Sequence, residues 1–398
     1  MRGFALAAVL FGSACPALAQ GSDSPWLVEY DGEATLVVAP GGSSDTAPER
    51  ENALYEVGLG LTAERTFQSG WTLGGRAVFR AARDHPARPA GTRNLFATDL
   101  QRLGGALSRL SAGPLNIDEG PRGSLETAYL FLDTGYGEFS LGRDTGVAAR
   151  FHEGNVSALS RSTLVDPDLD VSGIAAINTR PDITGPSVKL SYVTPRLLGV
   201  RAGVSYTPRA DVRGLDRDAT ESGDPFRPEL ENTVEVGLNA SRRLRESGIR
   251  LRAGLSYSTA ELDVPTALEA TYDDRIDVVS VGGEIEWQDT YRLGLNWLGA
   301  DEGLPSGGDY SAWSVGLGYE RDDWTASLTY GEAEIDAVAA ESSGVSLALA
   351  RRVNDYISVA VSWQDRELDL DATALFSSDV RGPRSDGVVF EVTLEFEK

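Results

Sequence analysis

The connections between the predicted β-strands of this 398-residue chain alternate between short turns and long polar loops. The short turns lie near 68–70, 133–135, 245–248, 288–289, 322–323 and 354–355, and the long segments are 83–121, 145–185, 208–230, 259–275 and 366–385. Short turns at one rim and long loops at the other are typical of a transmembrane β-barrel. A β-sandwich instead mixes loop lengths according to its topology. The alternation therefore favours a barrel.

About sixteen strands are predicted between these connections, because apolar and polar residues alternate along each of them. They lie near 26–38, 51–66, 71–82, 122–132, 136–144, 186–194, 199–207, 231–243, 248–258, 276–287, 290–298, 310–321, 324–332, 342–353, 356–365 and 386–396. Most are close to the roughly 9–11 residues that a tilted strand needs to cross a bilayer. The predicted fold class is all-β, a transmembrane antiparallel β-barrel of about sixteen strands with a long third loop folded into its lumen.

The two faces of the predicted strands differ in chemistry. In 291–297, 313–319 and 324–330 one face is wholly apolar and begins and ends with an aromatic residue, while the other carries Gly, Ser, Thr, Asn or Arg. Aromatic residues at both ends of an apolar band are typical of a membrane interface. Charges on the opposite face cannot point into lipid, where Arg or Lys at the midplane costs about 2–4 kcal/mol. A water-filled interior follows, and no row of aromatic residues is expected on its wall.

The first nineteen residues have the features of a secretory signal peptide. Arg2 supplies a positive start, 4–11 an apolar core, and 17–19 a small-residue cleavage site. A lipoprotein signal ending at Cys15 is the alternative, which lacks a large apolar residue three places before the cysteine. The expected mature chain is one barrel domain, 20–398. The net charge of −24 of the full sequence argues against nucleic acid as a partner.

The stretch 125–185 carries the most specific signal in the chain. A hairpin of two aromatic and β-branched runs, 125–132 and 138–143, is followed by about forty residues without strand alternation that still contain apolar side chains such as Phe151 and Ile177. Loops this long without regular structure are usually functional. The segment AYLFLDTGYGEFSLGR at 128–143 resembles the fourth and fifth strands of Gram-negative general diffusion porins, of the alphaproteobacterial type, and 191–208 resembles the hairpin that follows their constriction loop.

This resemblance implies a function and partners. It implies an outer-membrane porin, a homotrimer, whose water-filled channel passes small hydrophilic solutes and ions by passive diffusion. The residues 145–185 would then be the constriction loop, and outer-membrane lipid and lipopolysaccharide would surround the barrel. In loop two, a helix is predicted around 98–110, either packed on the rim or acting as a latch onto a neighbouring subunit.

The resemblance also implies a charged constriction, in which acidic loop residues oppose basic residues of the wall. The acidic candidates in the loop are Glu153, Asp166, Asp168, Asp170 and Asp182. The basic candidates on the wall are Arg76, Arg80, Lys189 and Arg201. Arg143, at the start of the loop, either marks a bulge or anchors the loop. Because the loop also contains Arg150, Arg161 and Arg180, the sequence does not determine the sign of the electrostatic field that the loop produces in the pore.

Metal and enzyme chemistry have thin support in the sequence. Asp166, Asp168 and Asp170 are spaced so that they could hold calcium, although the glycine and terminal Glu of an EF-hand are absent; no other cofactor is expected. An enzyme is not expected either. A surface hydrolase would need His152 beside Ser157 or Ser160. A substrate-specific channel and a non-conducting barrel, serving as an adhesin or hydrolase, are the alternatives to a general porin.

Overall fold

The computed structural model of the protein describes residues 26–41, 43–44, 51–85, 122–210, 229–263, 274–301, 309–336, 340–370 and 384–397. One short helix, α1 (Val147–Arg150), lies between β6 and β7. The strands are β1 (Leu27–Val38), β2 (Ser43–Ser44), β3 (Ala53–Thr66), β4 (Thr72–Arg83), β5 (Arg122–Thr134), β6 (Gly137–Asp144), β7 (Ser187–Val193), β8 (Val200–Ala210), β9 (Glu229–Leu244), β10 (Ile249–Asp263), β11 (Arg275–Trp287), β12 (Tyr291–Asp301), β13 (Asp309–Arg321), β14 (Trp324–Ile335), β15 (Ala340–Asn354), β16 (Ile357–Leu370) and β17 (Arg384–Glu397).

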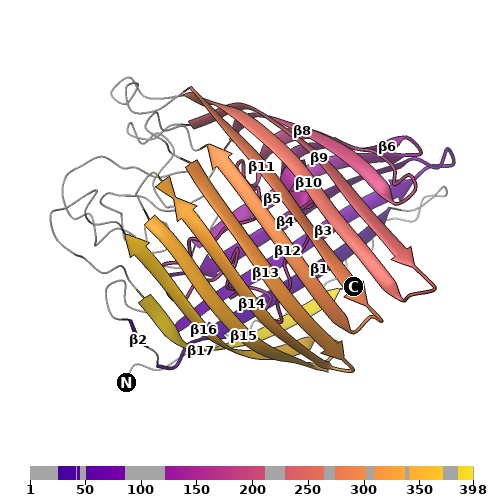
Figure 1. Ribbon diagram of the computed structural model, residues 1–398. Helices are drawn as coiled ribbons and strands as arrows, with labels where there is room; N and C mark the ends of the chain where they lie inside the picture. The colour runs from indigo at the N-terminus through magenta and orange to yellow at the C-terminus, as the bar shows by residue number, and fades with distance from the viewer. Residues whose placement is uncertain are drawn as a thin grey trace.

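Sixteen long strands form a closed antiparallel barrel, as the sequence predicts (Figure 1). Each long strand pairs with its neighbour in the chain, and β1 pairs with β17 from Asp31 opposite Glu397 to Val38 opposite Phe390, which closes the sheet. The two-residue strand β2 was not predicted, and it pairs with β17 at Ser43 and Ser44. In the described residues, no helix is long and apolar enough to cross a membrane.

The outer face carries the apolar band and both aromatic girdles. On β12 and β13, Tyr291 lies opposite Tyr319 and Trp297 opposite Trp313, so that aromatic residues meet in rows across strands. The rings of Tyr291 and Tyr319 are 5.4 Å apart between centroids. Such cross-strand pairs stabilise a sheet and fix its register. Since these side chains are exposed although they are large and apolar, the outer face is built for a non-aqueous neighbour.

The inner face differs from the prediction in two ways. The interior is not wet throughout: its wall turns apolar near the rim of the long connections, where Ile276, Leu298, Tyr310 and Leu368 are buried against the segment between β6 and β7. Aromatic residues also face inward on β5, where Tyr129 lies opposite Arg76 and Phe131 opposite Gly74. The alternation rule could not reveal the apolar wall, because a wall covered by a loop is buried like a protein core. The inward aromatic residues follow a register shift between β4 and β5, which interrupts the alternation.

Candidate functional site

The segment 145–186, here called the inner loop, joins β6 to β7 and lies inside the barrel (Figure 1). Its apolar side chains, which include Phe151, Leu164, Leu169 and Ile177, are almost completely buried. Leu164 and Ile177 join the inward apolar residues of the wall, while Leu169 packs with Val37, Leu54 and Val389 of β1, β3 and β17. The inner loop is therefore held by a hydrophobic contact with opposite parts of the wall.

Glycines on the wall mark the course of the inner loop. On β10, a side chain at Gly254 would collide with the carbonyl oxygen of Phe151, and on β11 one at Gly282 would collide with that of Glu153. On the next strands the loop backbone also comes close to the inward glycines Gly294 and Gly316, while the loop side chains of Val147 and Phe151 come close to Gly203 and Gly237. Glycine is required wherever two backbones approach this closely. The first part of the loop thus lies flat against β8 to β13.

A buried carboxylate fixes the middle of the inner loop. Glu391 of β17 accepts five hydrogen bonds of 2.6–3.2 Å from Ser160, Arg161 and Ser162, three from backbone N–H groups and two from serine hydroxyls. Successive backbone N–H groups around one anion form an anion-binding nest. This Glu391 nest joins the loop to the last strand of the barrel.

Arg161 clamps the same part of the loop to β1, on the other side of the β1–β17 pairing that closes the barrel. Its guanidinium donates to both oxygens of Glu33 on β1 at 2.7 and 2.8 Å and to Asp168 at 2.6 Å. Glu56 of β3 lies 3.3 Å away and also accepts a 2.6 Å bond from Arg80. Burial acts against the charge of Arg161, but the bond to Glu33 and the charge of Asp168 outweigh it and raise its pKa. Arg161 therefore keeps its charge inside the barrel.

The acidic residues predicted for the constriction have different partners. Glu153 reaches the wall, where it accepts a 2.8 Å hydrogen bond from Asn239, whereas Asp168 accepts one from Arg161 of the loop, within the clamp. Asp166 instead accepts hydrogen bonds from Thr179 and Arg180, and Asp170 from Ser172 and Ala175, so both carboxylates bind the loop itself. Asp182 lies where its charge acts on buried Lys189. The role of these residues in the pore remains a prediction.

The basic residues predicted for the wall also lie in different surroundings. Arg76 donates to Asp31 at 3.0 Å, and Arg80 donates to Glu56 and to Glu126. Lys189 is 1% exposed and donates to Thr184 and Gly185, so it holds the end of the inner loop and does not face the lumen. Arg201 is partly exposed on the inward face of β8.

Arg143 contacts the barrel wall at the beginning of the inner loop. Its Nε donates to the carbonyls of Leu125 and Glu126 on β5. The register of β4 and β5 shifts next to this point, between Val78 and Phe79. The strand of Arg143 itself, β6, pairs with β5 and β7 without a register shift, so it has no bulge at this residue. The bulge lies on the neighbouring strands, and Arg143 spans it.

Sequence reasoning missed the carboxylates that hold the loop. Glu391 and Glu33 stand at inward positions of the last and first strands, opposite Val37 and Glu395, respectively. The alternation of apolar and polar residues shows that both side chains point inward. Nothing in the neighbouring sequence, however, distinguishes a carboxylate that binds a loop from one that faces water. Arg366 of β16 is a similar case, since it is buried and donates to the carbonyls of Thr163 and Leu164.

The calcium and hydrolase hypotheses gain no geometric support from the described residues. Among these, no group of three or more His, Cys, Asp and Glu side chains is placed to hold a metal ion. Calcium at Asp166, Asp168 and Asp170 remains an untested prediction. Neither ring nitrogen of His152 has a hydrogen-bond partner, and the Ser160 hydroxyl donates to Glu391. A serine–histidine pair is thus not formed.

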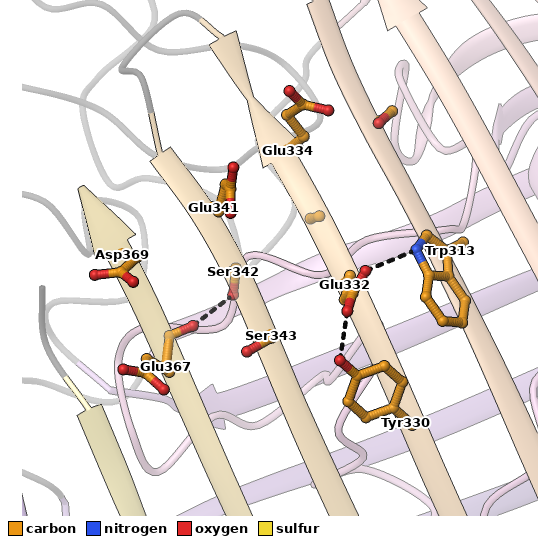
Figure 2. A pocket seen from close by; sticks show the side chains of 11 residues that line it. Trp313, Tyr330, Glu332, Glu334, Glu341, Ser342, Ser343, Glu367 and Asp369 are labelled. Atoms are coloured by element: carbon orange, nitrogen blue, oxygen red, sulfur yellow. Dashed lines mark hydrogen bonds between the residues drawn. The ribbon is translucent and has the colours of Figure 1, made fainter. Parts of the chain in front are cut away.

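A shallow acidic groove of 390 Å³ lies on the barrel where β13 to β16 approach the long connections (Figure 2). Glu332 accepts hydrogen bonds from Trp313 and Tyr330 of the aromatic girdle, and the further carboxylates are those of Glu334, Glu341, Glu367 and Asp369 (Figure 2). The outer face therefore changes from aromatic to acidic at this girdle.

A closed antiparallel barrel with an apolar outer band, paired aromatic girdles and a loop fixed inside the lumen defines an outer-membrane channel. The sequence model of the Gram-negative porin family matches residues 5–369, and the chain belongs to this family. It is an outer-membrane, multi-pass β-barrel porin that acts as a diffusion channel.

Solved structures of porins share this fold. OmpF of Salmonella typhi, in complex with daunomycin, is 11% identical over 93% of this chain and 97% of its own, with a TM-score of 0.60. The anion-selective porin of Comamonas acidovorans is 12% identical over 94% and 100%, with a TM-score of 0.55. OprB of Pseudomonas putida is 11% identical over 93% and 94%, with a TM-score of 0.57. No curated protein sequence matches the chain.

Proposed function

We propose that this porin passes small hydrophilic solutes and ions through a water-filled lumen, and that the inner loop and the facing wall select them by size and charge. The observation that carries the proposal is the anchoring of the loop at mid-barrel through the Glu391 nest and the Arg161 clamp. A loop fixed in this way narrows the lumen without needing to move.

The charges around the clamp favour cations. Among the described residues, the four carboxylates of Glu33, Glu56, Glu126 and Asp168 lie near three guanidinium groups, those of Arg80, Arg161 and Arg180. An excess of carboxylates along a pore attracts cations and repels anions. The expected selectivity is therefore for small cations and neutral polar solutes.

The test is single-channel conductance of the purified protein in a planar bilayer, with the reversal potential measured in a salt gradient. Steady open steps and a reversal potential of the sign for cation preference are the expected results. The variant Glu126→Gln, which removes one carboxylate beside Arg80, should shift the reversal potential toward anions. Correctly folded protein without conductance would overturn the proposal.

The oligomer and the surroundings of the barrel belong to the same proposal. On the outer face of β3 to β5, the small residues Ala63, Gly75, Ala77 and Ala128 form a depression rimmed by leucines. A face of this shape suits a neighbouring subunit, and the trimer form of OmpT from Vibrio cholerae is 12% identical, with a TM-score of 0.53. The proposed assembly is a homotrimer without enzymatic activity, surrounded by outer-membrane lipid and lipopolysaccharide.

A further inference from the structure

Arg201 differs from the other arginines near the short-turn rim of the lumen. Arg243, Arg250 and Arg252 each lie 2.6–3.3 Å from a carboxylate, and Arg292 is paired with Glu320. Arg201 makes no ion pair in the described part of the chain, and its buried Nε has no hydrogen-bond partner. Its guanidinium carbon lies 4.8 Å from the centre of the Phe151 ring.

The groups around Arg201 do not neutralise it. Asn239, directly opposite on β9, accepts from Arg196 at 2.7 Å and donates to Glu153 at 2.8 Å. The carboxylate of Glu138 accepts a 3.1 Å hydrogen bond from Arg150. Arg150 also lies 3.9 Å from Asp144, so the carboxylates near Arg201 are all engaged by other groups. The guanidinium of Arg201 is left without a paired carboxylate among the described residues.

The surroundings of Arg201 also fix the position of its guanidinium. The Phe151 ring comes from the inner loop, where it is 1% exposed and packs with Val147 and Val193. A guanidinium that stacks on a fixed ring keeps its plane and loses little entropy when it forms hydrogen bonds. Because the side chain of Arg201 is partly exposed, solutes in the lumen can reach it.

We propose that Arg201, stacked on Phe151, is the centre of a binding subsite for small organic carboxylates on their way through the lumen. The subsite rests on the proposed channel function and names a solute class for it. A carboxylate matches the planar donor fork of arginine and would supply the acceptors that the protein does not. It would retain anionic nutrients locally in a channel whose clamp favours cations.

The experiment measures how succinate reduces the current of single channels that carry potassium chloride, with uncharged succinamide as the size control. In the unmodified protein, succinate should reduce the current with saturation, and succinamide should not. Arg201→Gln should weaken the effect about tenfold, which is the order expected for charge-assisted hydrogen bonds to one guanidinium. Arg201→Lys, which keeps the charge without the fork, should fall in between.

Arg243→Gln is the matched control, because it removes the same charge from the same rim at an arginine that is already paired with Asp289. Succinate should act on this variant as on the unmodified protein. Equal loss of the effect in both glutamine variants, or no effect of succinate on a conducting channel, would overturn the subsite and leave the channel function intact. If the folded protein does not conduct, saturation-transfer NMR of succinate with the same variants still decides on the subsite.

Discussion

His152 is a buried imidazole in the inner loop that makes no hydrogen bond through either nitrogen. Its Nε2 lies 4.0 Å from Asp166, the residue that holds the returning part of the loop through Thr179 and Arg180. Burial lowers the pKa of His152; Asp166 and Glu153 oppose this effect and Arg180 adds to it. The docked loop therefore keeps His152 neutral.

Acidification should loosen the docked loop through His152. A histidine in the released loop has a pKa of about 6.5, and the docked one binds a proton less readily. The docked state therefore has its full stability above this pH and loses up to about 1.4 kcal/mol for each pH unit below it. We expect larger fluctuations of the single-channel current at pH 5 than at pH 7.5. The variant His152→Phe should show equal fluctuations at both values; if it responds like the unmodified protein, another group is responsible.

At the scale of the elements, the sequence predicts the strands well but ends them too early toward the long loops. The strand predicted at 248–258 extends to Asp263 in β10, and that at 356–365 extends to Leu370 in β16. The outward residues of these extensions, such as Glu261 and Glu367, are polar, although pairing with the preceding strand continues. The alternation of apolar and polar residues marks only the part of a strand that faces lipid. The backbone hydrogen bonds between strands continue beyond that part, so the strands are longer than predicted.

The course of the inner loop could not be predicted from the sequence. Its contacts join residues far apart in the chain, such as Ser162 and Glu391, and serines are common in all loops. Lys189 and Glu391 stand at inward positions of their strands, where a charge is expected to face the water of the lumen, yet both are buried under the loop. Burial of the apolar loop residues was predictable, because Phe151 and Ile177 had to pack somewhere; the partner strands were not.

The inward glycines that the inner loop contacts allow a direct test of the position of this loop. In Gly282→Ala the new Cβ would meet the Glu153 carbonyl and the Asn296 side chain, so the loop must shift. Overpacking of this kind costs about 1–3 kcal/mol. We expect a lower unfolding temperature and an altered conductance. Gly58→Ala is the control, since Gly58 also faces inward but its nearest neighbour would be 4.0 Å away. Similar behaviour of both variants would contradict the docked position.

Removal of the Glu391 carboxylate should free the middle of the loop. In Glu391→Ala the buried N–H groups of Ser160, Arg161 and Ser162 lose their acceptor, and each hydrogen bond to a charged group contributes about 1.5–3 kcal/mol. Faster proteolysis within 145–186 and a noisier channel are the expected results. Glu391→Asp keeps the charge and should lie closer to the unmodified protein. A loop that stays protected in Glu391→Ala would show that the nest does not hold it.

At the scale of the whole molecule, the outer surface of the barrel is not uniform. Large side chains such as Leu295 and Trp297 cover β10 to β17, whereas β3 to β5 present the small-residue depression around Ala77. Lipid tails can fill any shape, so a depression has no value against lipid. Against another subunit, small residues allow two backbones to approach closely and gain contact without a hydrophobic driving force.

Filling the depression should therefore dissociate the proposed trimer without unfolding the barrel. Ala128→Trp places a large ring where a neighbouring subunit would pack, and tryptophan itself is tolerated against lipid. Ala253→Trp is the control, because Ala253 faces outward on β10, away from the depression. We expect light scattering of detergent-solubilised protein to give one third of the mass for Ala128→Trp and the unchanged mass for Ala253→Trp. If Ala128→Trp keeps its trimer, subunits associate through another face; if the unmodified protein is a monomer, the depression serves no assembly.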